Sequence, residues 1–243
     1  MALIIGRKPV LEAINSNKNI EQVILRFGQT GGIINAIRVA SKKRNIKLTE
    51  LSQNKFDELV QNKNSQGVAA KISEREYLTL DDLILQTKSI QNPLLIILEE
   101  IQDVHNVGAI LRTAECANVN GVIITKRKSA PLNETVAKIS AGAVEHLKIC
   151  QVTNLAQTID TLKQYGYWIV GSSLENAVNY TSVDYKMPIA LIMGNEQKGI
   201  RRLTSEKCDH IIKISMEGKI QSLNVSVSTG VILFEILRQR KNI

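Results

Sequence analysis

The sequence predicts an α/β protein in which a small first domain precedes a larger domain with a mostly parallel, doubly wound sheet. Apolar runs of strand length alternate with helical patterns along the chain, which is typical of strand–helix–strand units. The run LLIIL at residues 94–98 is apolar at every position, as in strands that parallel sheets bury on both faces. With 243 residues, the chain is long enough for a small domain and a medium one.

The first domain is expected over residues 1–71, because alternating helical and strand-like segments there form one small α/β unit. Its helices are expected over residues 9–15, 31–45 and 53–61, and its strands over 20–27, 46–52 and 66–73. Residues 72–92 are expected to be a linker that contains a short helix over 79–87. The linker ends at Asn92, because the residue before a proline is disfavoured in the helical conformation.

The second domain is expected over residues 93–243, where the alternation of strands and helices restarts. Its strands are expected over residues 94–100, 121–125, 146–152, 167–173, 189–194 and 210–215. Its helices are expected over residues 107–119, 132–142 and 154–166, with a helical turn within 199–208. A final helix is expected from about Asn224, with one apolar stripe made of Val227, Val231, Phe234 and Leu237.

Composition and charge narrow the class of protein. A formal net charge of +8 suits a polyanionic partner such as RNA or DNA, and a merely soluble basic protein is the alternative. No stretch approaches the length of a membrane span, and the N-terminal apolar run lacks the pattern of a signal peptide. Cys116, Cys150 and Cys208 are far apart and form no metal-ligand spacing. These features favour a reduced, cytoplasmic protein without a metal site.

Three loops that follow predicted strands of the second domain carry small or hydrogen-bonding residues. In open α/β sheets, ligands bind outside the carboxyl ends of the strands, so these loops form the candidate site on position alone. The first loop leads into a helix that carries Asn106 at its mouth and Arg112 further along. An ordinary cap by Asn106 and a surface arginine are the alternative interpretation.

The second loop begins at Gly194, where the missing side chain lets a ligand approach the backbone closely. Glu196 could orient a partner, and the cations that follow it could meet phosphates. These cations are Lys198, Arg201 and Arg202. The alternative is a tight turn that opens a solvated helix.

The third loop follows a strand that ends near Ile214, and it includes Ser222 and Asn224, whose side chains offer donors and acceptors. A loop followed by a helix from about Asn224 is favoured here over a half-buried strand. The alternation of Ser and Val then indicates a helix that packs tightly through small residues.

No GxGxxG sequence follows any predicted strand. This absence argues against a dinucleotide-binding dehydrogenase. It also argues against a methyltransferase of the ordinary doubly wound type, which usually has a glycine-rich loop after its first strand.

Together, the three loops resemble the motifs of the SpoU (TrmH-type) family of RNA ribose 2'-O-methyltransferases, within the SPOUT superfamily. The stretches HNVGAILRTAECANVNGVI, IALIMGNEQKGI and SLNVSVSTGVILFEILRQR resemble the first, second and third motifs, in the family's order and spacing. GRKPVLEAI and SQGVAA also resemble the start and end of the family's N-terminal substrate-binding domain. The resemblance therefore covers nearly the whole chain.

This resemblance implies a trefoil-knotted second domain, in which the C-terminal segment threads a loop, and a homodimer with the active site near the interface. It implies S-adenosylmethionine as the cofactor, held by backbone groups at Gly194, Ile214 and Leu223. The family's polar catalytic and substrate positions match Asn106, Arg112, Glu196, Ser222 and Asn224.

The implied reaction is an in-line displacement, in which a ribose 2'-hydroxyl attacks the methyl carbon of a sulfonium. Arg112 matches the family's favoured activator, yet an arginine is effectively always protonated and is a poor base. We therefore expect Arg112 to clamp the neighbouring phosphate and to stabilise the developing alkoxide. Positioning of the hydroxyl and the methyl group would supply much of the rate.

Within the family, the two-domain length and the third motif look most like enzymes that methylate a guanosine in the peptidyl-transferase region of 23S rRNA. A tRNA and another rRNA nucleotide are the alternative substrates. An RNA-binding assembly factor without catalysis and a small-molecule dehydrogenase are the alternative classes. The enzyme is favoured, because all five polar positions of the family are present.

Overall fold

The computed structural model describes residues 2–16, 20–61, 65–72, 76–195 and 198–241. The chain forms two compact units that divide between Glu76 and Tyr77. Each unit contains its own sheet and its own buried core.

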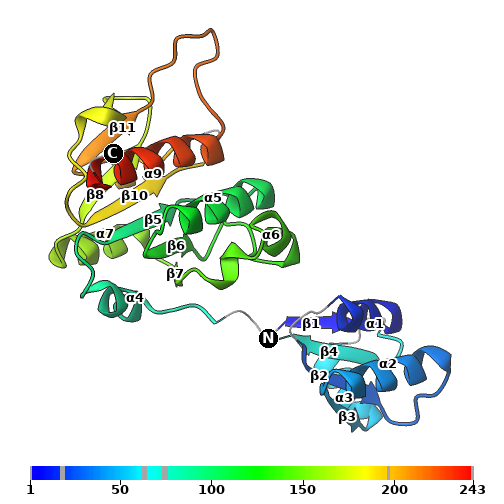
Figure 1. Ribbon diagram of the computed structural model, residues 1–243. Helices are drawn as coiled ribbons and strands as arrows, with labels where there is room; N and C mark the ends of the chain where they lie inside the picture. Colours follow the sequence, from blue (N-terminus) through cyan, green and yellow to red (C-terminus); the bar gives the residue numbers. More distant parts are fainter. Residues whose placement is uncertain (1, 17–19, 62–64, 73–75, 196–197, 242–243) are drawn as a thin grey trace. The chain divides into compact units, whose positions relative to one another are not determined.

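The first unit is a four-stranded mixed sheet with helices on both faces (Figure 1). Its strands are β1 (Ala2–Ile5), β2 (Ile20–Arg26), β3 (Lys47–Leu51) and β4 (Val68–Ile72), in the order β1-β4-β2-β3. β2 and β3 run parallel, whereas β4 runs antiparallel to both of its neighbours. Its helices are α1 (Arg7–Asn15), α2 (Gly32–Lys43) and α3 (Gln53–Val60).

The alternating side chains of β2 explain why this sheet has a helix layer on each side. Val23 and Leu25 pack into a cluster with residues of α1 and α2. Ile24 points the other way and packs with Phe56 and Val60 of α3. The predicted helices and strands of this unit are confirmed within a few residues, but β1 was not predicted.

The second unit is a seven-stranded sheet in which every recorded pairing is parallel. Its order is β7-β6-β5-β10-β8-β11-β9. The strands are β5 (Leu94–Leu98), β6 (Gly121–Thr125), β7 (Ile149–Val152), β8 (Trp168–Ser172), β9 (Val178–Asn179), β10 (Ile189–Met193) and β11 (His210–Lys213). The predicted parallel sheet is confirmed, and the predicted strands are present.

Helices cover both faces of this sheet, so it is doubly wound, as predicted (Figure 1). One face carries α5 (Val104–Cys116), α6 (Glu134–Ile139) and α9 (Val225–Lys241). The other face carries α4 (Leu80–Thr87) and α7 (Leu155–Gln164). The remaining helical segments are short: η1 (Ala143–Glu145), η2 (Tyr180–Ser182) and α8 (Arg202–Ser205). Along β5, alternate residues enter the two cores, which is why LLIIL has no polar position.

The strand order creates a switch point at the middle of the sheet. From β5 the chain continues to β6 and then β7, which lie on one side of β5 in the sheet. β10 lies on the other side of β5, and β8 and β11 lie beyond β10. The loops that leave β5 and β10 therefore diverge at their carboxyl ends. Such a crevice is the usual ligand site of an open parallel sheet.

The predicted linker over residues 72–92 is shorter in the structure. Leu83 and Ile84 of α4 are buried in the second unit's core, and Leu78 forms a bridge with Cys150. Residues 77–92 thus belong to the second unit. The short helix was predicted, but the apolar positions that bury it were not recognised as a core-facing pattern.

The stripe predicted on the last helix packs inward only in part. α9 buries Val225, Ile232, Leu233 and Ile236 against the sheet and α5. Of the stripe, Leu237 packs against this core, whereas 51% of Val227 and 52% of Phe234 are accessible to solvent. α9 is therefore apolar on two faces. Among the described residues, no helix is long and apolar enough to cross a membrane.

Candidate active site

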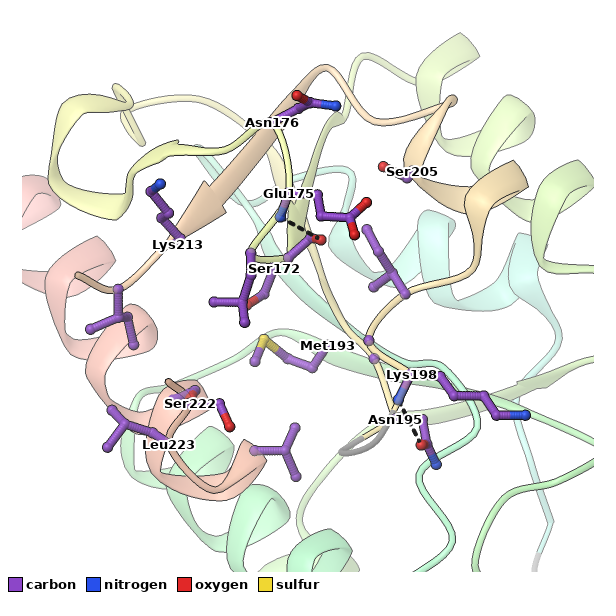
Figure 2. A pocket seen from close by; sticks show the side chains of 18 of the residues that line it. Ser172, Glu175, Asn176, Met193, Asn195, Lys198, Ser205, Lys213, Ser222 and Leu223 are labelled. Atoms are coloured by element: carbon purple, nitrogen blue, oxygen red, sulfur yellow. Dashed lines mark hydrogen bonds between the residues drawn. The ribbon is translucent and has the colours of Figure 1, made fainter. Parts of the chain in front are cut away.

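A cavity of about 760 Å³ lies at the carboxyl edge of the second unit's sheet. It is lined by Gly194, Ile214, Ser222 and Leu223, four residues that the sequence placed in the site. Figure 2 shows Ser222 and Leu223 on the α9 side of this cavity, with Asn195 and Lys198 on the opposite side. We call it the first cavity. Its walls come from the loops after β8, β10 and β11.

A second cavity, of about 490 Å³, lies beside the loop that follows β10. Its lining includes Asp103 from the loop after β5, Asn106 from the first turn of α5 and Lys128 from the loop after β6. Asn195 and Lys198 line both cavities. The two spaces are therefore adjacent, with the β10 loop between them.

A hydrogen bond between Asn106 and Asn224 links the first and third motifs at the start of α9. The Nδ2 of Asn224 donates to the Oδ1 of Asn106 at 2.9 Å, and Asn106 is 9% exposed. The Oδ1 of Asn224 accepts from the backbone N–H of Ser226 at 2.8 Å and from its hydroxyl at 2.6 Å. This network caps the first turn of α9 and fixes which side of the Asn224 amide donates.

The alternative in which Asn106 caps its own helix is not what the structure shows. α5 begins at Val104, and the carboxylate of Asp103 caps it by accepting from the His105 N–H at 2.7 Å. Asn106 lies in the first turn, where its side chain is available to Asn224 and to the second cavity.

Arg112 lies on the exposed side of α5, outside the lining of either cavity. It is six residues beyond Asn106, or about 9 Å along the helix axis. Its guanidinium makes no hydrogen bond or ion pair with any residue that the structure describes. The side chain is thus free to meet an anion. Glu196, the remaining predicted site residue, lies outside the described residues.

Gly194 is required for a reason that adds to the predicted approach of a ligand. A Cβ atom at this position would lie 2.2 Å from the Gly199 carbonyl carbon and 2.3 Å from the Ile200 nitrogen. The backbone that approaches Gly194 so closely is therefore the protein's own loop. This approach folds the β10 loop back on itself and shapes the wall of the first cavity.

Comparison with known proteins decides the family. The SpoU rRNA methylase family matches residues 93–234, and a domain family described as RNA 2'-O ribose methyltransferase substrate binding matches residues 3–78. The chain belongs to the SpoU methylase family. It is thus an RNA ribose 2'-O-methyltransferase by family.

Relatives of this SpoU methylase match over nearly their whole length. A TrmH family tRNA/rRNA methyltransferase of Staphylococcus saprophyticus is 42% identical over 99% of this chain and 97% of the relative. The TrmH family tRNA/rRNA methyltransferase YacO of Bacillus subtilis is 37% identical over 98% of this chain and 95% of the relative.

Solved structures share the fold of this SpoU methylase. The AdoMet-bound rRNA methyltransferase of Sinorhizobium meliloti has a TM-score of 0.65 at 24% identity, covering 97% of this chain and 86% of that one. The TrmH/SpoU tRNA modifying enzyme of A. aeolicus has a TM-score of 0.57 at 33% identity, covering 67% of this chain and 83% of that one.

Glu99 supports a loop at the candidate site of this SpoU methylase, and the sequence analysis missed it. It is 3% exposed, and its carboxylate accepts from the Arg201 N–H at 2.9 Å and from the Thr204 hydroxyl at 2.6 Å. Both contacts hold the end of the β10 loop onto β5. The available signal was an acidic residue directly after a wholly apolar strand, where the chain is still buried.

The three basic residues of the β10 loop differ in their availability. Arg201 pairs with Glu100, and Arg202 pairs with Glu206 at 3.0 Å. Lys198 lines both cavities. Of the three, Lys198 is the best placed to meet a ligand anion at the junction of the cavities.

The pKa values of the buried Cys150 and the half-buried Cys208 argue against nucleophilic thiol chemistry at these two residues. Burial, together with the Asp209 carboxylate, raises the pKa of the Cys208 thiol to about 12. Burial also raises the pKa of the Cys150 thiol to about 11. Both thiols are therefore protonated at neutral pH. The described residues contain no cluster of His, Cys, Asp and Glu that could hold a metal ion.

Proposed function

We propose that this SpoU methylase transfers the methyl group of S-adenosylmethionine to a ribose 2'-hydroxyl of RNA, with the cofactor in the first cavity and the target nucleotide in the second. The observation that carries this proposal is the adjacency of the two cavities, which share Asn195 and Lys198. A group transfer needs two binding sites whose reacting atoms can come within contact distance. The Asn106–Asn224 pair stands at this junction.

The residues of the first cavity fit the cofactor. Its volume is within the range of small-molecule sites, and its lining mixes apolar side chains such as Met193 and Leu223 with the backbone of Gly194. Apolar contacts and backbone groups suit an adenine ring and a ribose. When bound, the cofactor would supply an electrophilic methyl group on a sulfonium. AdoMet-bound structures of the Sinorhizobium meliloti and Streptomyces viridochromogenes methyltransferases support this assignment.

Residues of the chain would position the ribose and balance its charge. Asn106, Ser222 and Asn224 would hold the ribose by hydrogen bonds, with Glu196 as a further polar partner. Arg112 would neutralise the adjacent phosphate and the developing alkoxide, because its guanidinium stays protonated. The proton of the hydroxyl would then leave through phosphate or water. We also infer the family's trefoil knot in the second unit, with the segment before α9 threaded through a loop.

A homodimer would place a second copy close to Arg112. On α9, Val227 and Phe234 are exposed and Val231 between them is half-buried, and together they form an apolar face of the kind that marks an interface. A Cβ at Gly230, on the same helix, would lie 3.7 Å from the Thr113 side chain, next to Arg112 in sequence. The active site would therefore lie near the dimer interface.

The preferred substrate is a guanosine in the peptidyl-transferase region of 23S rRNA, which would make the protein a cytoplasmic rRNA-processing enzyme. The net charge of +8 supports an RNA partner. The names of the relatives include both tRNA and rRNA, so tRNA is the second candidate.

The test is methyl transfer from labelled S-adenosylmethionine to unmodified 23S rRNA and to bulk tRNA. Arg112→Ala should abolish transfer and leave cofactor affinity nearly unchanged. Arg38→Ala is the matched control, because Arg38 forms only a surface ion pair with Glu50 in the first unit. Label in a 2'-O-methylguanosine of 23S rRNA would support the preferred substrate. Label in tRNA would make tRNA the substrate in place of 23S rRNA. Cofactor binding without transfer to either RNA contradicts a naked-RNA substrate, and no cofactor binding favours an assembly factor.

A further inference from the structure

One edge of the first unit's sheet gathers loops that are far apart in the sequence. β4 runs antiparallel to β1 and β2, so the carboxyl ends of those strands lie beside the start of β4. The Gly6 N–H donates to the Val68 carbonyl at 2.9 Å, and the Arg26 N–H donates to the Gly67 carbonyl at 2.9 Å. We call residues 6–8, 27–31 and 65–67 the Phe27 edge.

The aromatic side chain of Phe27 is exposed to solvent, whereas its backbone is fixed by a hydrogen bond. Its side chain is 75% exposed, although its N–H donates to the Leu51 carbonyl at 2.7 Å. The next residue, Gly28, has a φ of 80°, which reverses the chain directly after the ring. An exposed ring on a fixed backbone can stack on a flat partner with little loss of conformational entropy.

The positive charge of the Phe27 edge is not neutralised within the edge. The Arg7 guanidinium donates to the Gln29 Oε1 at 2.6 Å and to the Gln66 carbonyl oxygen at 3.0 Å. These neutral acceptors fix the direction of the guanidinium and leave its charge in place. Lys8 is exposed and makes no ion pair with a described residue, and the three loops contain no Asp or Glu.

Two helices also begin at this edge. α1 and α2 follow Gly6 and Gly31, which have φ values of 107° and 118°, and neither helix has a side-chain cap. Their first N–H groups and the positive ends of their dipoles add to the attraction for anions. The helix ends therefore add to the attraction for anions that Arg7 and Lys8 provide beside Phe27.

We propose that the Phe27 edge binds the substrate RNA, with an unpaired base stacked on Phe27 and adjacent phosphates held by Arg7 and Lys8. This inference rests on the proposed function, because it takes RNA as the substrate. Base stacking on aromatic rings beside cations is how proteins hold unpaired nucleotides. An apolar protein partner fits less well, because the residues around Phe27 in these loops are glycines, polar side chains and cations.

The test is the dissociation constant of the full-length protein for an unmodified 23S rRNA transcript and for bulk tRNA, measured over a range of salt concentrations. Phe27→Ala should raise the constant by about 5- to 150-fold for the substrate RNA, as the loss of one stacked base predicts. Lys8→Gln should lower the slope of log affinity against log salt by about 1, because one phosphate contact is lost. Val39→Ala is the matched control, since Val39 is 68% exposed on α2 and lies outside the edge.

Rescue by Phe27→Trp separates stacking from a general loss of structure. This variant should bind RNA at least as well as the wild type, since its ring also stacks. Wild-type affinity of Phe27→Ala, or failure of Phe27→Trp to bind, would overturn the inference. Cofactor affinity should be the same in all variants. RNA binding by the edge without any methyl transfer would reject the proposed function alone, and absence of RNA binding by the wild type would reject both.

Discussion

The close approach at Gly194 makes Gly194→Ala an informative substitution. The new Cβ would lie 2.2 Å from the Gly199 carbonyl carbon, whereas ordinary contacts begin at 3.4 Å. The obstructing atoms are backbone, so a side-chain rotation cannot relieve the clash. The segment at Gly199 and Ile200 must therefore move by about 1 Å, a shift large enough to disturb a positioned reaction by about 100-fold.

The same displacement should weaken both folding and cofactor binding. Overpacking of this kind costs about 1–3 kcal/mol in the free energy of unfolding, which corresponds to a fall in Tm of about 2–12 °C for a domain of this size. Gly194, Gly199 and Ile200 all line the first cavity. We therefore expect the Kd for S-adenosylmethionine to rise by at least about 10-fold, and kcat/KM to fall by about 100-fold.

Thermal unfolding and titration calorimetry with S-adenosylmethionine would measure these effects. Gly218→Ala is the matched control, because a Cβ at Gly218 has no atom within 4 Å. The control should keep the wild-type Tm and Kd. If Gly194→Ala binds the cofactor with wild-type affinity, the β10 loop does not form the cofactor wall, and the assignment of the first cavity is wrong.

Three further predictions follow from other contacts. Glu99→Gln should lower stability by about 1–3 kcal/mol in denaturant unfolding, because an amide cannot accept from both Thr204 and the Arg201 N–H; an unchanged midpoint would contradict the role of Glu99. Phe234→Asp should convert a dimer to a monomer in sedimentation, and a dimer that survives would place the interface elsewhere. At pH 7.5 a thiol reagent should label the exposed Cys116, whereas the buried Cys150 and the half-buried Cys208 should react much more slowly until the protein unfolds, because their raised pKa values keep them protonated.

The sequence was sufficient to predict elements whose pattern is set by local burial. The strands at residues 94–98 and 189–193 are covered on both faces, so every residue in them is apolar. Such a continuous apolar run can be recognised in the sequence. The last helix begins at Val225, one residue from its predicted start at Asn224, because Asn224 caps it. The β1 strand was missed, because four apolar residues at the N-terminus carry no period that distinguishes a strand from other short apolar runs.

Long-range contacts explain what the sequence could not supply. Glu99 reaches Thr204 across more than 100 residues, so nothing near Glu99 indicates its partner. Gly194 was predicted as a ligand contact, yet its constraint comes from Gly199, whose position depends on how the loop closes. The exposed stripe around Phe234 was visible as a pattern, but burial of the neighbouring face was not. The roles of Arg112, Ser222 and the other site residues remain predictions.

The position of β10 affects the order in which the protein can assemble during synthesis. Of the second unit's strands, β5, β6 and β7 leave the ribosome first and are neighbours in the sheet, but β8 can pair with β10 only later, since Ile189 pairs with both Leu94 and Trp168. Such pairings over long sequence separations slow folding. The first cavity is completed later still, because Leu223 forms part of its wall. A nascent chain that has not reached Leu223 lacks the proposed cofactor site, so a cofactor at 100 times its Kd, which adds about 2.7 kcal/mol to stability, would act selectively on chains that have passed this point.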